Sequence, residues 1–163
     1  MLKFRNIYES YAADVYRFSV WLSGDLVEAE DITSETFIRA WTHRATIRTE
    51  TLKAYLFTIA RNVYLQQLRK KKRQVVLDDI YVDPAPEPDK ALETHRELLR
   101  VQSVLQTFPE IDRSAFILRV QLDLPCAEIA RVLQISLSAT KVKIHRVRKK
   151  LINIMVNKEA EES

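Results

Sequence analysis

Glycine and cysteine are almost absent from this chain, which holds one of each, Gly24 and Cys126, in 163 residues. Ordinary usage is about 7% glycine, so Gly-rich phosphate loops, dinucleotide-binding fingerprints and most tight hairpins are excluded. A lone cysteine excludes an intrachain disulfide and fits a cytoplasmic protein. No apolar run reaches the length of about 18 residues that spans a membrane, and no signal peptide pattern opens the chain. We therefore predict an all-α protein without a membrane span.

The sign of the charge changes along the chain. Residues 1–73 carry 13 basic and 8 acidic side chains, residues 74–93 carry 1 and 6, and residues 94–163 carry 12 and 8. The acidic stretch also holds three of the five prolines. Proline lacks an amide donor and pushes the preceding residue out of helical geometry. This pattern predicts two small helical domains joined by a flexible acidic, Pro-containing linker over residues 74–93.

Apolar residues at three- and four-residue steps in residues 1–73 predict three helices, over about 4–22, 26–41 and 52–73, with a loop at 42–51. The third helix is apolar on two nearly opposite sides. Such a helix is either wedged between neighbours or offers one face to a partner. The apolar residues are Leu52, Leu56, Ile59 and Val63 on one side, and Phe57, Tyr64 and Leu68 on the other.

The second domain, residues 94–157, contains a predicted helix-turn-helix, and residues 158–163 are expected to form a tail. Helices are expected over about 91–107, from 109, over 125–133 and over 137–156, with a turn at 134–136. The last helix is strongly basic, and its N-terminal end would enter the DNA major groove. Lys141 and Lys143 are then expected to reach bases or phosphates. A merely solvated basic face is the alternative.

Five consecutive cations, residues 69–73, end the third helix. Cations are favourable at a helix C-terminus, so the fold alone could explain them. With Tyr55, Phe57 and Tyr64 upstream, the run fits nucleic acid better, because cations hold phosphates and aromatic rings stack on exposed bases.

Catalytic and metal-binding patterns are missing from the sequence. The three histidines lie in separate segments, and none has a second ligand at metal-binding spacing. Cys126 is best explained as a half-buried structural thiol. We therefore expect no enzymatic activity, no metal and no cofactor.

Three motifs, in order, resemble those of bacterial RNA polymerase sigma factors of the sigma-70 family, extracytoplasmic-function (ECF) group. Residues 28–41, EAEDITSETFIRAW, are similar to the family signature AEDlvQeTFlraW. Residues 52–63, LKAYLFTIARNV, are similar to LraWLyrIARNl. In the second domain, EIA at 128–130 and KVKIHRVRKKL at 141–151 are similar to EIA…TVKSRLHRARKKL. The resemblance spans about residues 4–155 and therefore covers both domains.

Several positions depart from the family pattern, and they bear on promoter preference more than on overall function. Gln134 stands in place of the usual turn glycine, so it is expected to hold a positive backbone angle. The other departures are Ser34 for Gln, Tyr55 for Trp, Thr58 for Arg, Gln66 for Asp and Ala139-Thr140 for Thr-Val.

The resemblance implies three sets of site residues. The helix at 26–41 would dock on the clamp helices of the largest polymerase subunit through Asp31, Glu35, Phe37, Arg39 and Trp41. The minus-10 promoter element and the melted strand would be bound by Arg44, Tyr55, Arg61, Asn62, Arg69, Lys70 and Arg73. The minus-35 element would be read by Ser138, Lys141, Lys143, Arg146 and Arg148.

The resemblance further implies core RNA polymerase, including its flap, promoter DNA and an anti-sigma protein as partners, with no cofactor. Two other functions are weighed against a sigma factor. A stand-alone helix-turn-helix regulator would leave the helices at 26–41 and 52–73 without a role. A nucleic-acid-modifying enzyme would lack a catalytic constellation. Binding to core polymerase distinguishes the sigma factor from both.

Overall fold

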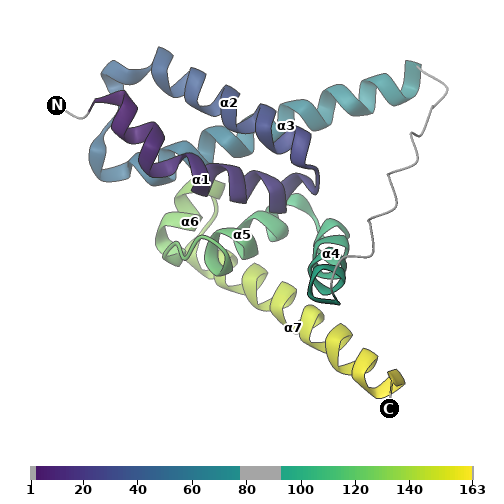
Figure 1. Cartoon of the computed structure of the whole chain (residues 1–163). Helices are drawn as coiled ribbons and strands as arrows, with labels where there is room; N and C mark the ends of the chain where they lie inside the picture. The colour runs from purple at the N-terminus through teal and green to yellow at the C-terminus, as the bar shows by residue number, and fades with distance from the viewer. Residues whose placement is uncertain (1–2, 78–92, 163) are drawn as a thin grey trace.

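The computed structural model describes residues 3–77 and 93–162, which form helices joined by turns (Figure 1). An all-α fold is therefore confirmed for the described residues. The α-helices are α1 (Phe4–Ser23), α2 (Leu26–Thr42), α3 (Leu52–Leu77), α4 (Glu93–Gln106), α5 (Glu110–Val120), α6 (Cys126–Leu133) and α7 (Leu137–Glu162). Two short 3-10 turns, η1 (Arg44–Thr46) and η2 (Thr49–Thr51), lie in the connection that the sequence predicted as a loop.

The turn between α1 and α2 is set by two neighbouring residues. Gly24 ends α1 in the left-handed region, at φ 73°, where glycine has no steric penalty. The carboxylate of Asp25 then accepts the amides of Val27 (2.8 Å) and Glu28 (3.1 Å), and so caps α2. The sequence placed this turn correctly because both signals are local.

Helices α1, α2 and α3 form the first unit, whose buried apolar side chains pack together. Phe18 of α1 and Phe57 of α3 are both buried and meet edge to face, with ring centroids 5.3 Å apart. The other large and fully buried members from these helices are Val15, Leu22, Ile32, Leu56 and Val63. Both apolar sides of α3 therefore contribute to the core of its own unit.

Helices α6 and α7 form the predicted helix-turn-helix, and the turn is fixed at both ends. The amide of Ile135 donates to the Ala130 carbonyl (3.1 Å), which closes α6 with a Schellman-type bond. Gln134 occupies the left-handed position of this turn, at φ 57°, so the positive angle expected of it is confirmed. The Ser136 hydroxyl accepts the Ala139 amide (3.0 Å) and caps α7.

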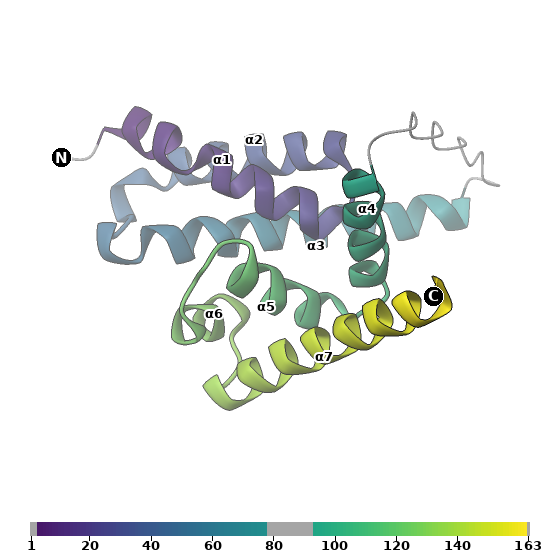
Figure 2. The ribbon, with the colours of Figure 1, turned by 60° about the horizontal axis from the view of Figure 1, so that its bottom comes forward.

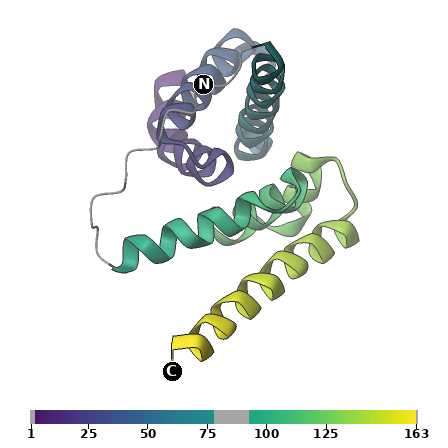
Figure 3. The ribbon, with the colours of Figure 1, turned by 90° about the vertical axis from the view of Figure 1, so that its right-hand side faces the viewer.

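The two helical units pack against each other, which the tethered arrangement predicted from sequence did not include. Figures 2 and 3 show α4–α7 lying along one side of the α1–α3 unit. Helix α6 contacts α3, and α5 contacts α1. The buried apolar residues of both units form one continuous cluster. Of the two explanations for a helix apolar on two sides, α3 is thus wedged between neighbours.

One group of polar contacts between the units lies at the C-terminal end of α1. The Gln102 amide donates to the Val20 carbonyl (2.9 Å), and the Gln106 amide donates to the Leu22 carbonyl (3.2 Å). A Cβ added at Gly24 would lie 3.3 Å from the Gln106 side-chain nitrogen. The single glycine therefore permits both the left-handed turn and the close approach of α4.

Helix lengths differ from the sequence predictions at two ends. Helix α3 continues to Leu77, four residues into the linker predicted at 74–93, because no helix breaker precedes the acidic stretch. Helix α7 continues to Glu162 through the residues predicted as a tail. The rest of the linker, residues 78–92, lies outside the described residues.

Neither a membrane-spanning helix nor a metal-binding cluster is found among the described residues. None of the helices in this part of the chain is long and apolar enough to cross a membrane. Within the same residues, no three His, Cys, Asp or Glu side chains gather in a way that could hold a metal ion.

Gln134→Gly is expected to raise the free energy of unfolding by about 0.5–1 kcal/mol. A residue with a Cβ in the left-handed region destabilises the fold by about 1–2 kcal/mol, and glycine removes this strain. The greater entropy of glycine in the unfolded chain offsets about 0.5–1 kcal/mol of that stabilisation. Gln134→Ala is the matched control, because it removes the same exposed side chain but keeps the Cβ. Urea denaturation of the unaltered chain and the two variants measures the effect. If the glycine variant is no more stable than the alanine variant, backbone strain at Gln134 is contradicted.

Candidate protein and nucleic-acid interfaces

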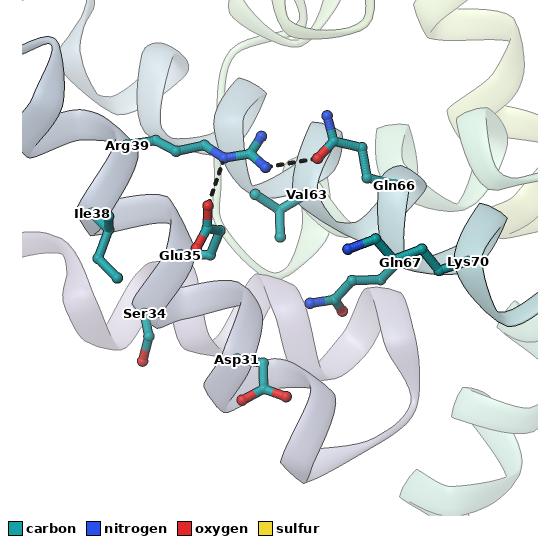
Figure 4. A pocket seen from close by; sticks show the side chains of 9 residues that line it. All are labelled: Asp31, Ser34, Glu35, Ile38, Arg39, Val63, Gln66, Gln67 and Lys70. Carbon is teal, nitrogen blue, oxygen red and sulfur yellow. Dashed lines mark hydrogen bonds and ion pairs between the residues drawn. The ribbon is translucent and has the colours of Figure 1, made fainter.

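One face of α2 and the adjoining side of α3 enclose an open groove of about 420 Å³ (Figure 4). Asp31 is exposed at one end of this groove, and Glu35 lies nearer its centre. The full lining is Asp31, Ser34, Glu35, Ile38, Arg39, Val63, Gln66, Gln67 and Lys70. The structure thus brings together three of the five residues predicted for protein docking, Asp31, Glu35 and Arg39.

Arg39 ties the two walls of the groove together. Its Nε donates to Glu35 Oε1 (3.0 Å) one turn back on α2, and its Nη2 donates to Gln66 Oε1 of α3 (2.6 Å). The two dashed lines in Figure 4 mark these bonds. Glu35 keeps 43% of its side chain exposed and Arg39 keeps 34%. Gln66, which departs from the family's Asp, therefore orients Arg39 through a neutral amide.

Aromatic rings form a second surface, beside the groove, at the junction of α1 and α2. Phe4 lies edge-on to Trp41 with centroids 5.0 Å apart, and Tyr8 lies edge-on to Phe37 at 4.9 Å. Trp41 and Tyr8 are each about half exposed. Phe37, predicted as a docking residue, is only 4% exposed, so the structure makes it a support for Tyr8 and a member of the core.

Arg44, predicted for the minus-10 site, lies against this aromatic surface. Its guanidinium is 4.0 Å from the centre of the Trp41 ring, and its Nη1 donates to the Trp41 carbonyl (3.0 Å). A cation over the face of Trp is attracted by the ring quadrupole. The structure therefore joins Arg44 to a residue predicted for polymerase docking.

The basic end of α3 is exposed, as expected of a surface for phosphates. Arg69, Lys70 and Arg73 face solvent, while Lys71 forms an ion pair with Glu28 of α2. The stacking role considered for Phe57 and Tyr64 is wrong, because their side chains are 1% and 6% exposed and fill the interior.

Of the other residues predicted for the minus-10 element, Tyr55 is half-buried and packs against the core, and Asn62 is exposed. Arg61 instead points to the second unit. Its Nε donates to Glu110 Oε1 (2.6 Å) and its Nη2 donates to Glu110 Oε2 (2.9 Å). Each of the two side chains is 16% exposed. Arg61 is therefore engaged by a carboxylate in this arrangement.

A buried tyrosine lies one turn further along α3. Arg113 of α5 donates from Nη2 to the Tyr64 hydroxyl (2.7 Å) and from Nη1 to the Phe108 carbonyl (3.0 Å). Burial raises the pKa of the Tyr64 hydroxyl, and the neighbouring positive charge of Arg113 opposes that rise. Tyr64 is therefore neutral at physiological pH and acts as a hydrogen-bond acceptor between the units.

The basic face of α7 is partly confirmed as an exposed surface. Ser138, Lys141, Arg146 and Arg148 are exposed, as a DNA-reading helix requires. Lys143 is different, because its Nζ lies 3.0 Å from Asp112 Oδ1 of α5 and its side chain is 23% exposed. The structure therefore separates Lys143 from the other four residues predicted for the minus-35 element.

Some exposed residues beside these surfaces were missed by the sequence reasoning. Tyr8 and Ile38 are both exposed and line the aromatic surface, and neither was among the predicted docking residues. On α7, Val142 and His145 are exposed among the cations. The buried stripe Thr140, Ile144, Val147 and Leu151 could have shown this, because residues half a helical turn away from it must face outward.

Comparison with known proteins identifies two family regions. Residues 7–74 match the model of sigma-70 region 2, and residues 98–151 match that of sigma-70 region 4. The first region coincides with α1–α3, and the second begins in α4 and ends within α7.

Whole-chain relatives agree with these regions. The chain is 31% identical over 150 residues to ECF RNA polymerase sigma factor SigM of Bacillus subtilis, covering 89% of this chain and 90% of SigM. It is 27% identical over 162 residues to SigW of the same species, covering 91% and 86%. Against SigE of Mycolicibacterium smegmatis it is 30% identical over 156 residues, covering 93% of this chain but 61% of SigE.

Among solved structures, the sigma factor RpoE of Bartonella quintana, in complex with the anti-sigma factor NepR, superposes with a TM-score of 0.79 at 25% identity. The match covers 93% of this chain and 96% of that one. With both regions present and a relative aligned along nearly its whole length, the chain belongs to the ECF group of the sigma-70 family, and it is a sigma factor that directs RNA polymerase to promoters.

Proposed function

We propose that the two units divide the work of initiation, with residues 1–73 docking on core polymerase and holding the minus-10 element, and residues 94–157 reading the minus-35 element. The observation that carries this division is the separation of exposed charge. Acidic and aromatic groups gather at α2, whereas exposed cations lie at the end of α3 and on the outer face of α7. The extents of the two family regions support the same division.

Docking on the clamp helices of the largest subunit is assigned to the exposed edge of α2. Asp31 and Glu35 supply negative charge, and Trp41 with Ile38 supplies exposed apolar area. An aromatic anchor next to charges is typical of the centre of a protein interface. Tyr8 extends this surface onto α1, and Phe37 supports it from beneath.

Minus-10 binding is assigned to α3 and the connection before it, and minus-35 binding to α7. Arg69, Lys70 and Arg73 would hold phosphates of the melted strand, and Tyr55 and Asn62 lie upstream on the same helix. Ser138 and Lys141 lie in the first turns of α7, the part of a recognition helix that enters the major groove. Arg146 and Arg148, further along, fit phosphate contacts that position the helix.

An anti-sigma protein is a further partner in this proposal. The support is the RpoE structure, which was solved with its anti-sigma factor bound and which resembles this chain across both units. The flap of the polymerase is proposed as the partner of the second unit. The chemistry of RNA synthesis belongs to the polymerase, so no cofactor is assigned to this chain.

Asp31→Lys is expected to weaken binding to purified core polymerase by about tenfold or more, because a reversed charge at an interface opposes the partner's complementary field. Glu30→Lys is the matched control, since it makes the same charge change on an adjacent exposed residue that does not line the groove. Fluorescence anisotropy of the labelled sigma factor measures both affinities. If the two variants bind equally, the docking face has been misplaced.

Lys141→Ala is expected to weaken promoter binding by the assembled holoenzyme and to reduce the slope of log affinity against log salt by about 1, the value for one lost phosphate contact. If Lys141 contacts a base instead, the loss would be about 1–3 kcal/mol and would depend on the sequence. Affinity for core polymerase should not change. Lys3→Ala removes the same charge from an exposed position on the other unit and serves as the control.

A promoter library transcribed by the reconstituted holoenzyme provides the readout for Lys141→Ala. A variant that loses polymerase affinity together with promoter use would argue against separate roles for the two units. Strong sequence-specific duplex binding by the free chain, without polymerase affinity, would instead favour a stand-alone regulator.

A further inference from the structure

The C-terminal half of α7 carries three exposed aliphatic side chains. Ile152, Met155 and Val156 are each more than half exposed. Residues three and four positions apart are neighbours on a helix, so these side chains form one continuous apolar strip. The side of α7 that holds Val147 and Leu151 is buried instead. This half of α7 extends past α5 and α6 (Figure 1), so the strip faces solvent.

The strip lies beyond the part of the chain that matches region 4. That match covers residues 98–151, whereas α7 continues to Glu162. None of the residues predicted for polymerase or for DNA belongs to the strip. The functions proposed above therefore do not account for its exposed apolar area.

Opposite charges flank the strip on the same side of the helix. Arg148 stands four residues before Ile152, and Glu159 stands three residues after Val156. Both side chains are exposed, and their spacing places them in line with the apolar residues. We call this surface the pairing face, and it consists of Arg148, Ile152, Met155, Val156 and Glu159.

The order of the pairing face, positive then apolar then negative, is complementary to its own reverse. A two-fold axis that sets Ile152 opposite Val156 of a second copy also brings Arg148 within one residue, about 1.5 Å of helix, of the level of Glu159 of that copy. The symmetry makes the same charge pair twice, once at each end of the contact. In a parallel arrangement like charges would meet, so the antiparallel one is favoured.

The length of the pairing face limits the strength of such a contact. From Arg148 to Glu159 the helix runs about 17 Å, or three turns. A helix pair of this length buries less than the roughly 1,200 Å² at which specific, stable interfaces begin. The expected dimer is therefore weak, with a dissociation constant in the micromolar range.

We propose that the partner of the pairing face is a second copy of this chain, bound in antiparallel orientation. The two apolar strips meet at the centre, where they leave water. Arg148 of each copy lies beside Glu159 of the other. Because pairing covers Arg148, a paired chain cannot present this residue to DNA. That consequence alone rests on the proposed function, since Arg148 is a predicted minus-35 residue.

Val156→Gln tests the apolar centre, and Val142→Gln is its matched control. Val142 is an equally exposed valine of the same helix, outside the pairing face. Glutamine is a good helix former, so both variants should keep α7 intact. Sedimentation equilibrium of the full-length chain, over the micromolar range, is expected to show a monomer–dimer equilibrium for the unaltered chain and for Val142→Gln. Val156→Gln is expected to weaken dimerisation by about tenfold or more, because each dimer loses two buried valines.

Exchange of the flanking charges tests the orientation. Arg148→Glu alone is expected to weaken dimerisation, because it sets two carboxylates against each other at both ends. Combining it with Glu159→Arg reverses both charges and is expected to return the dissociation constant to that of the unaltered chain. A combined variant that dimerises no better than Arg148→Glu would overturn the antiparallel arrangement.

Two results with the valine variants would overturn the proposal. One is the mass of a single chain at every concentration, and the other is equal dimerisation of Val156→Gln and Val142→Gln. If circular dichroism shows that Val156→Gln loses helix, the charge exchange decides alone. A chain that stays monomeric, and in which only Val156→Gln loses affinity for core polymerase, would assign the face to polymerase instead. The sedimentation samples contain neither polymerase nor DNA, so failure of the proposed function would leave the dimer unaffected.

Discussion

The burial of α3 on two sides is the constraint on which the rest of the structure depends. Leu56 on one side and Phe57 on the other are both buried in the core of the α1–α3 unit. The side that carries Phe57 also presents Tyr64 to the second unit, where Arg113 donates to its hydroxyl. A helix of this kind cannot leave both apolar faces in water without losing roughly 1.5–3 kcal/mol for each large side chain exposed. The position of the second unit, and with it the availability of Arg61, follows from this requirement.

The fold of each unit could be predicted from sequence wherever the signals are local. Asp25 caps α2 two and three residues ahead of itself, and Gln134 stands at a turn whose geometry is decided within α6. Apolar periodicity located every α-helix of the described residues, with the largest errors at ends where no breaker stands, as after α3. The contact between the units could not be predicted in this way. Arg61 and Glu110 are separated by 49 positions, and no local pattern reports such a pair.

The candidate site was predicted unevenly for a related reason. Family resemblance selected surfaces on which Asp31, Trp41, Arg69 and Lys141 are exposed, and their roles stay predictions. Residue type alone does not reveal whether a cation is free or paired, and Lys143 proved to be held by Asp112. Nor does it separate an aromatic ring that can stack on a base from one that fills a core. Tertiary packing decided both questions.

The side-chain amides of Gln102 and Gln106 donate to the last carbonyls of α1, so these hydrogen bonds join the two units. In the separated units these carbonyls would bond to water instead, so the exchange of partners changes the free energy little, about 0.5–1.5 kcal/mol for each bond. Misalignment by one helical turn, however, would break this matched set of donors and acceptors. These hydrogen bonds therefore specify the register of α4 on α1 more than they hold the two units together.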